Sequence, residues 1–359
     1  MVSVGQFNLV AFSYNFTDSF SLMTFLDILT RGVVGRSSGS KKENTASAIN
    51  SAPPDQHPLY AISTRSVDDK IAVGTFIRGS NDNYISIEGR KYHHRLPPSK
   101  ILWSCNALDV FASTSSSLRI WRVSNMEKPE MKLHTSSKTG NGTASGAAPS
   151  PITCMDWNAC NPGKIATCHV DTTVAIWDIT KGKLDTQLIA HDKSVLDVAF
   201  CGKSNPSIFA SVSEDGSLRI FDTRDLDHST IAYEDSNPIL RLRWNQIKTN
   251  LVACIVSESP DILFFDMRKP GQVFNRIAAS DPSVVPNVIC WNSTFSSHLA
   301  AGLSNGNVAS INIETGAVVH FPVSGASEVV NVEWNTRDLE SVVAIHGTHA
   351  SVIKLVAAK

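Results

Sequence analysis

A run of alternating apolar residues that ends in an aromatic side chain recurs along this chain of 359 residues, at intervals of about 45 residues. The six clearest runs end at Trp103, Trp157, Phe200, Trp244, Trp291 and Trp334. A second series follows the first by about 20 residues, at 118–121, 174–177, 218–221, 263–265, 309–311 and 352–355. Two series in phase predict units of several short strands. Such units cannot bury both faces of their sheets alone, so they stack radially as a β-propeller.

A weaker unit, with apolar runs at residues 59–62 and 84–87, brings the number of repeats to seven. At about 150 residues per domain, the length alone would suggest two domains. The repeat instead predicts one all-β domain, a seven-bladed β-propeller over residues 58–358.

Residues 1–57 are predicted to be an N-terminal extension and linker, because their second half is rich in small and polar residues. The same composition marks residues 134–151 as a flexible insertion. The last repeat ends on a third-strand pattern, so closure of the ring needs a strand from the N-terminal side. Residues 7–12 are the candidate for that strand.

The unit that begins at His191 has polar residues at regular places. His191 precedes the first strand, Ser211 lies on the second, and Asp215 begins an Asp-Gly turn before the third. An Asp-Gly pair between alternating apolar runs is a strong hairpin signal. The pattern resembles a WD repeat, in which the matching His, Ser, Asp and Trp form a buried hydrogen-bonded tetrad. Phe221 stands here in place of Trp and removes the indole donor.

The preceding unit has Thr167, Asp171 and Trp177 at the same spacings, but no His in the loop before it. The resemblance to WD repeats implies the same structural duty for these three residues.

Longer strings of sequence resemble one family of WD-repeat proteins. The strings are 186–193, 195–200, 209–212, 215–219, 221–231, 233–235 and 240–245. They are similar to the WD-repeat scaffolds typified by plant Transparent Testa Glabra and animal cullin-4-associated factor 7. The resemblance covers residues 58–358 and is most specific over residues 150–245.

The resemblance implies a non-enzymatic, monomeric scaffold in the cytoplasm and nucleus. It implies protein kinases as partners in animals, and Myb and basic helix-loop-helix transcription factors in plants. It also implies substrate delivery to a cullin-4 ubiquitin ligase. The alternative is a WD-repeat targeting receptor that binds a cargo peptide, as in peroxisomal import.

Two arginines are candidates for the ligase contact. Arg224 and Arg268 each lie three residues after the third-strand aromatic of consecutive units. In cullin-4 substrate receptors a similar Trp-Asp-x-Arg motif docks onto the adaptor propeller. An exposed guanidinium offers a fork of donors to a partner, although each Arg could instead pair with the acid of its own unit, Asp222 or Asp266.

Catalytic, metal and cofactor sites are not expected. The chain has no His-Glu-x-x-His pattern, phosphate-binding loop or Gly-x-Ser-x-Gly elbow. Asp171, Asp197 and Asp215 recur like general acids, but turn and tetrad roles explain Asp171 and Asp215 more simply. His93 and His94 are adjacent, so on a strand they would point to opposite faces, which does not suit a metal.

The overall charge and the cysteines limit the class of protein further. With 32 Lys and Arg against 33 Asp and Glu, the formal net charge is −1, which argues against direct binding of nucleic acid. The seven cysteines are widely spaced and form no Cys-x-x-Cys pair, as expected for reduced thiols in an intracellular protein. No apolar run reaches the roughly 18–20 residues that span a bilayer.

Overall fold

The computed structural model describes residues 98–135, 149–323, 328–334, 341–346 and 349–357, with breaks at 108, 123, 126–127 and 203–204. N-terminal to these ranges it describes five strands by their backbone and pairing. They are β1 (Phe7–Asn15), β2 (Ala46–Ser51), β3 (Tyr60–Thr64), β4 (Lys70–Phe76) and β5 (Ile87–His93). Within this described part of the chain, no helix is long and apolar enough to cross a membrane.

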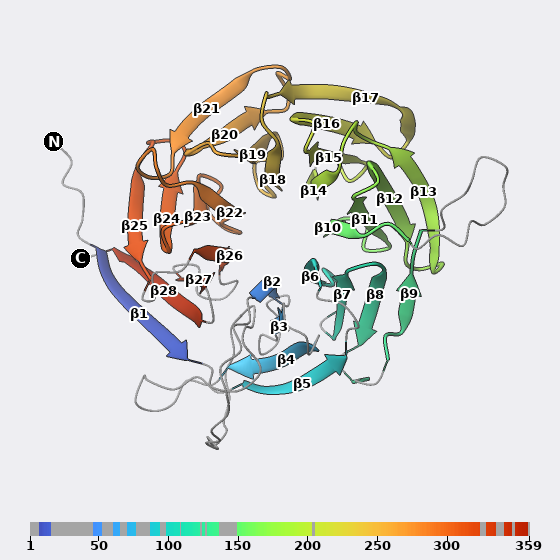
Figure 1. Ribbon diagram of the computed structural model, residues 1–359, viewed down its shortest axis with the longest axis horizontal. Coiled ribbons are helices and arrows are strands. Elements are labelled where there is room, and N and C mark those ends of the chain that lie inside the picture. The colour runs from blue at the N-terminus through green and yellow to red at the C-terminus, as the bar shows by residue number, and fades with distance from the viewer. Residues whose placement is uncertain are drawn as a thin grey trace.

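Consecutive strands pair into antiparallel sheets of four, and the sheets stand around a common centre as the blades of a propeller (Figure 1). Five blades are described in full. The first of them consists of β6 (Lys100–Trp103), β7 (Val110–Thr114), β8 (Leu118–Arg122) and β9 (Met131–Leu133). The second consists of β10 (Ile152–Trp157), β11 (Lys164–His169), β12 (Thr173–Asp178) and β13 (Lys183–Ile189). The next three consist of β14 (Val195–Phe200), β15 (Ile208–Ser213), β16 (Ser217–Asp222), β17 (Asp225–Glu234), then β18 (Ile239–Trp244), β19 (Leu251–Val256), β20 (Asp261–Asp266), β21 (Val273–Ala278), and β22 (Pro286–Trp291), β23 (His298–Leu303), β24 (Asn307–Asn312), β25 (Val318–Pro322). The all-β propeller that the repeat predicts is therefore confirmed.

The two ends of the chain meet in one sheet. β26 (Val329–Trp334), β27 (Ser341–His346) and β28 (His349–Ala357) are consecutive, and β1 pairs with β28 from Phe7↔Ala357 to Asn15↔His349. The outermost strand of this sheet thus comes from the N-terminal segment that the sequence analysis singles out.

The sheet of β2–β5 differs from the strand assignment made from the sequence. The apolar run at 59–62 overlaps β3, which is the second strand of its sheet and not the first. The run at 84–87 leads into β5, the fourth strand, and β2 lies within the segment taken for a linker. Apolar alternation indicates a strand but does not give its position in the sheet. The sequence pattern therefore places these two strands one position too early: the expected first and third strands are the second and fourth. The insertion predicted at 134–151 lies mostly outside the described residues.

The first strands of the blades lie side by side around the centre (Figure 1). Six of them, β2, β10, β14, β18, β22 and β26, carry a register shift near their start. A bulge of this kind increases the local twist of a strand. Its recurrence at the same place indicates that each blade bends in the same way where it enters the ring.

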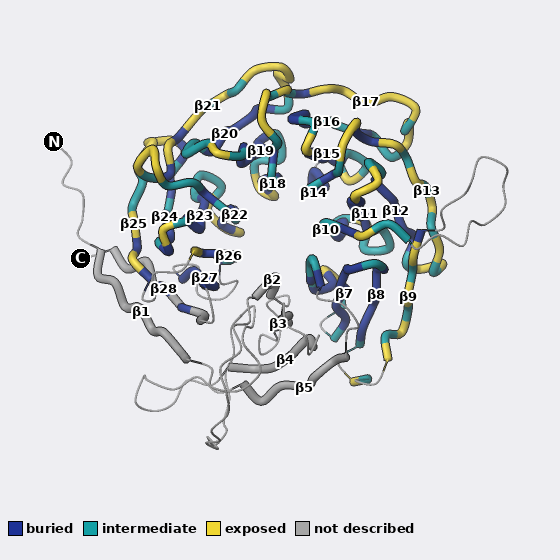
Figure 2. The backbone as a smooth tube through the Cα atoms, in the orientation of Figure 1, coloured by how far each residue is buried: buried dark blue, intermediate teal, exposed yellow. Residues whose placement is uncertain are grey.

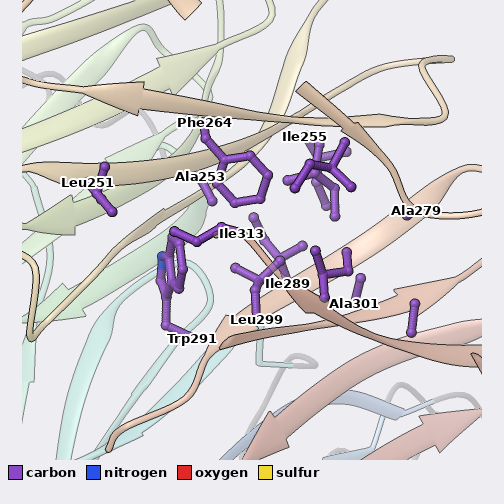
Figure 3. Close-up of a cluster of buried hydrophobic side chains, with 14 of the residues drawn as sticks. Leu251, Ala253, Ile255, Phe264, Ala279, Ile289, Trp291, Leu299, Ala301 and Ile313 are labelled. Carbon is purple, nitrogen blue, oxygen red and sulfur yellow. The ribbon is translucent and has the colours of Figure 1, made fainter. Parts of the chain in front are cut away.

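Apolar side chains of neighbouring blades pack against each other and form the core. Figure 3 shows one cluster, in which Phe264 and Leu251 of the β18–β21 blade meet Trp291 and Leu299 of the next. The rings of Phe264 and Trp291 pack edge to face with centroids 5.9 Å apart. Each blade buries a face on either side in this way, which is why a single unit is not stable alone.

The outer strands are the exposed edges of the blades (Figure 2). In β13, exposed and half-buried residues alternate along the whole strand. The central strands β19 and β27 are buried at every residue. Burial therefore increases from the rim of the propeller towards the middle of each blade.

Strand direction decides which loops share a face of the ring. We call the face that carries the loops between first and second strands, and between third and fourth strands, the lower face. Its loops in the best described blades are 158–163, 179–182, 201–207, 223–224, 245–250, 267–272, 292–297 and 313–317. The upper face carries the loops between second and third strands and between blades, at 170–172, 190–194, 214–216, 235–238, 257–260, 279–285 and 304–306.

Candidate protein-interaction surface

His191 lies in a buried hydrogen-bond network at the upper end of the β14–β17 blade. Its Nε2 is 2.8 Å from Ser211 Oγ, and its Nδ1 is 3.1 Å from Asp215 Oδ2 and 2.9 Å from Ser217 Oγ. Burial lowers the pKa of His191 to about 4, although the Asp215 carboxylate opposes the shift. The ring is therefore neutral at pH 7, and it ties the loop between two blades to the Asp-Gly turn.

Phe221 takes no part in these hydrogen bonds. Its ring is buried and stacks on Phe209 with centroids 5.0 Å apart. The structure thus brings His191, Ser211 and Asp215 together, and it packs the aromatic position only by apolar contact.

In the β10–β13 blade the indole of Trp177 donates to Thr167 Oγ1 at 2.8 Å. Asp171, expected at the same spacing, lies outside this network. It is exposed, and its Oδ1 accepts from Thr173 Oγ1 at 2.7 Å within the upper turn. The loop before this blade has no His equivalent to His191, so a carboxylate buried at position 171 would have no imidazole to accept a hydrogen bond from.

The sequence analysis missed the histidine that joins Thr167 in this buried network. His169 is buried, and its Nε2 lies 2.9 Å from Thr167 Oγ1. The signal was present in the sequence as a Thr-x-His pattern on one strand, where residues two apart point to the same face of the sheet.

Arg224 and Arg268 occupy equivalent lower-face loops of consecutive blades, and their side chains are 68% and 73% exposed. Each guanidinium forms an ion pair with the Asp two residues before it. Arg224 Nε donates to Asp222 Oδ1 at 2.9 Å, and Nη2 donates to Oδ2 at 2.5 Å. Arg268 makes the same two bonds to Asp266, at 2.9 and 2.5 Å.

This pairing uses both oxygens of each carboxylate but only part of each guanidinium. Hydrogen bonds from Arg224 hold the pKa of Asp222 below its usual range, and Arg268 does the same for Asp266. Both oxygens of each carboxylate accept from their own Arg. Among the described residues, no hydrogen bond from Nη1 of either Arg is present. What each pair offers to a partner is therefore a donor.

A Trp-Asn pair ends the first strand of several blades and builds the lower face, a feature that the sequence analysis did not use. In Asn245 the side-chain Oδ1 accepts from the backbone N–H groups of Ile247 and Lys248 at 2.9 and 2.8 Å. Its Nδ2 donates to the carbonyl of Ser296 in the next blade at 2.8 Å. The same turn occurs at Asn158 and Asn292. One side chain thus shapes its own loop and fixes it to a neighbour.

Two large apolar side chains project from loops of this kind. Ile247 is 45% exposed and Phe295 is 51% exposed, on neighbouring blades whose loops the Asn245–Ser296 bond joins. The backbone N–H of Met267 donates to the carbonyl of Asn250 at 2.8 Å, so the loop of Arg268 is attached to the loop of Ile247. Arginine donors and apolar side chains therefore lie on one connected part of the lower face.

The central channel contains buried charges. Asp197 is fully buried and accepts from Arg243 Nη1 at 2.7 Å and from the backbone N–H of Leu242 at 3.1 Å. Cys154 Sγ also lies 2.9 Å from Asp197 Oδ1. The carboxylate of Asp197 therefore links three consecutive blades, which is a structural role and not that of an accessible acid.

Asp156 lies on the wall of a cavity of about 230 Å³ that Trp157, Phe200 and Gln246 also line. Burial raises the pKa of Asp156 to about 6, although its Oδ2 accepts from the backbone N–H of Phe200 at 2.7 Å. No group of three or more His, Cys, Asp or Glu placed to hold a metal occurs in the described ranges.

Comparison with known proteins identifies relatives of this propeller. The chain is 33% identical over 276 residues to a DDB1- and CUL4-associated factor 7 homolog of Dictyostelium discoideum, covering 74% of this chain and 82% of that protein. This chain belongs to the WD-repeat family of that factor.

Two fungal proteins of the family show the same likeness. The chain is 34% identical over 234 residues to an uncharacterised WD repeat-containing protein of Schizosaccharomyces pombe, covering 57% of this chain and 52% of that protein. It is 32% identical over 283 residues to a WD repeat-containing protein of Saccharomyces cerevisiae, covering 66% of this chain and 53% of that protein. No family model matches the chain. The WD-repeat resemblance seen in the sequence is therefore confirmed by these relatives.

Proposed function

We propose that this WD-repeat protein is a non-enzymatic protein-interaction scaffold that acts as a substrate receptor of a cullin-4 ubiquitin ligase. The observation that carries the proposal is the pair of exposed arginines, Arg224 and Arg268, on one face of two consecutive blades. The name of the Dictyostelium relative associates that protein with DDB1 and CUL4. Arg224 and Arg268 would contact the DDB1 adaptor, and other loops would carry the client.

The ring is proposed to have seven blades, with β2–β5 as one of them and β1 as the strand that closes it. Support comes from the seven repeats in the sequence and from the pairing of β1 with β28. Residues 1–57 would then contribute strands to two blades. Protein kinases and Myb or basic helix-loop-helix transcription factors are the proposed clients, in the cytoplasm and nucleus. Affinity purification with mass spectrometry would identify them.

The adaptor contact is tested by the double change Arg224→Ala and Arg268→Ala. We expect binding to purified DDB1, measured by biolayer interferometry, to weaken about three- to tenfold, because two interface donors are lost. The melting temperature should change little, since exposed ion pairs contribute little to stability.

Arg276→Ala is the matched control. Arg276 is also an exposed Arg paired with an acid, Asp261, but it lies on the outer strand β21. Its replacement should leave DDB1 binding unchanged. Equal binding by the double variant and the wild type would contradict a role for the arginines, and no binding by the wild-type protein would refute the receptor function itself.

A further inference from the structure

We propose that Ile247 and Phe295 form the energetic centre of the adaptor interface and that Arg224 and Arg268 are its rim. This inference rests on the adaptor docking proposed above and names the side chains that supply most of its binding energy. It assigns a role to a surface that the arginine motif does not include.

Ile247 and Phe295 are unusual for large apolar residues of this protein. Most such side chains are buried between blades, whereas these two are 45% and 51% exposed on adjoining lower-face loops. A branched aliphatic and an aromatic side chain on adjoining loops gain free energy when a partner removes them from water.

Ile247 and Phe295 also lie on loops that hydrogen bonds already order. Asn245 fixes the loop of Ile247 by bonds at 2.9 and 2.8 Å, and Asn292 fixes the loop of Phe295 by two bonds at 2.8 Å. The ring of Phe295 packs on His298 with centroids 5.8 Å apart. Because the loops are already ordered, docking would cost little additional conformational entropy.

The arginines are suited to the rim and not to the centre. Each guanidinium keeps its own Asp partner, so burying it would also require desolvating that carboxylate. At a wet rim the remaining donors can reach acceptors on the partner without that cost. Interfaces commonly combine an apolar centre with a polar rim of this kind.

The distribution of charge between the two faces indicates which partner fits. Charged residues of the described lower-face loops from β10 to β25 are Lys181, Arg224, Lys248, Arg268, Lys269 and Glu314. Those of the upper-face loops over the same blades are Asp171, Asp192, Lys193, Glu214, Asp215, Asp235, Glu258 and Asp281. The loops of the lower face are thus mainly basic, with Asp178, Asp222 and Asp266 at the adjoining strand ends paired to three of the cations, and the loops of the upper face are mainly acidic. An adaptor surface that surrounds apolar side chains with carboxylates is complementary to the lower face alone.

The test compares four proteins in binding to purified DDB1 at 50 and 300 mM salt. They are the wild type, Ile247→Ser with Phe295→Ser, Arg224→Ala with Arg268→Ala, and the control Ile189→Ser. Ile189 is 81% exposed, at the end of the outer strand β13 next to the upper face. Thermal melts of each protein confirm folding, and Ile247→Ala with Phe295→Ala replaces the serine pair if that pair melts early.

We expect the Ile247 and Phe295 pair to weaken binding at least about 30-fold, as for central interface residues. The arginine pair should weaken it less, and mainly at low salt, because exposed charges are screened. Ile189→Ser should bind as the wild type does. If the folded Ile247 and Phe295 variant binds normally while the arginine variant does not, the apolar centre is refuted and the receptor function stands. If the wild type does not bind, the receptor function fails and this inference with it.

Discussion

His191, which is buried, and Asp156, which is half-buried, show how single residues make the stability of this propeller depend on pH. The His191 ring is held neutral by burial, with a pKa of about 4. Asp156 is held towards its protonated form by burial, with a pKa of about 6. Both shifts arise from desolvation, but they act on groups of opposite charge type, so their contributions to stability oppose each other between pH 4 and 6.

We predict that replacing His191 by Gln removes one pH-dependent part of the stability. In the unfolded chain His191 takes up a proton near pH 6.5, whereas in the folded protein it does so only near pH 4. The unfolded state therefore binds more protons in this window, and the free energy of unfolding falls as the pH drops from 6.5 to 4, by about 3 kcal/mol from this residue. Urea unfolding of both proteins across this window measures the difference.

Asp156→Asn serves as the comparison with the opposite sign. The raised pKa of Asp156 stabilises the fold at low pH, and this contribution is lost as the pH rises from about 3.8 to 6. The Asn variant should therefore lose less stability than the wild type over that rise. If the free energy of unfolding changed equally with pH in the wild type and in His191→Gln, the neutral state of the buried His191 ring would be contradicted.

At the scale of the element, the first strands and their Trp-Asn ends connect the blades. The indole of Trp291 donates to the carbonyl of Arg243 in the preceding blade at 3.0 Å, and that of Trp334 donates to the carbonyl of Cys290 at 3.1 Å. The side chain of Asn245 binds in the other direction, to Ser296 of the following blade. The inner strands β18, β22 and β26 are thus bonded to neighbouring blades by side chains as well as by apolar packing.

We predict that Asn245→Ala lowers the free energy of unfolding by about 1–3 kcal/mol, because the backbone N–H groups of two residues and the carbonyl of Ser296 lose their partner. Denaturant unfolding followed by tryptophan fluorescence measures the change. Asn161→Ala is the control, since the Asn161 side chain is exposed and makes no hydrogen bond among the described residues. A loss of equal size in both variants would show that the inter-blade bond contributes nothing.

At the scale of the whole molecule, an N-terminal strand completes the C-terminal sheet. The pairing of β1 with β28 runs over nine residues of each strand and joins positions more than three hundred residues apart. In this sheet β1 covers the edge of β28, which would otherwise offer unpaired backbone groups.

Deletion of residues 1–15 is predicted to lower the melting temperature by at least about 5 °C and to promote aggregation, because the edge of β28 is exposed. Differential scanning calorimetry and light scattering measure the two effects. Shortening the chain by deletion of residues 136–148, within the polar insertion, should change neither. An unaltered melting temperature after the N-terminal deletion would mean that the ring closes without β1.

The sequence by itself determined the all-β propeller, the first and third strands of the blades from Lys100 onward and the hairpin at Asp215, because apolar alternation and turn residues act between near neighbours in the chain. It misplaced Asp171 and missed His169, since the choice between them depends on whether a His arrives from the preceding loop. Only the tertiary structure decided that Arg224 and Arg268 pair with their own carboxylates, one of the two roles left open by the sequence, and that the loops of Ile247 and Phe295 are joined. The loops of Ile247 and Phe295 belong to neighbouring blades about 45 positions apart in the chain, and proximity over that distance follows from the packing of one sheet on another, not from any local pattern.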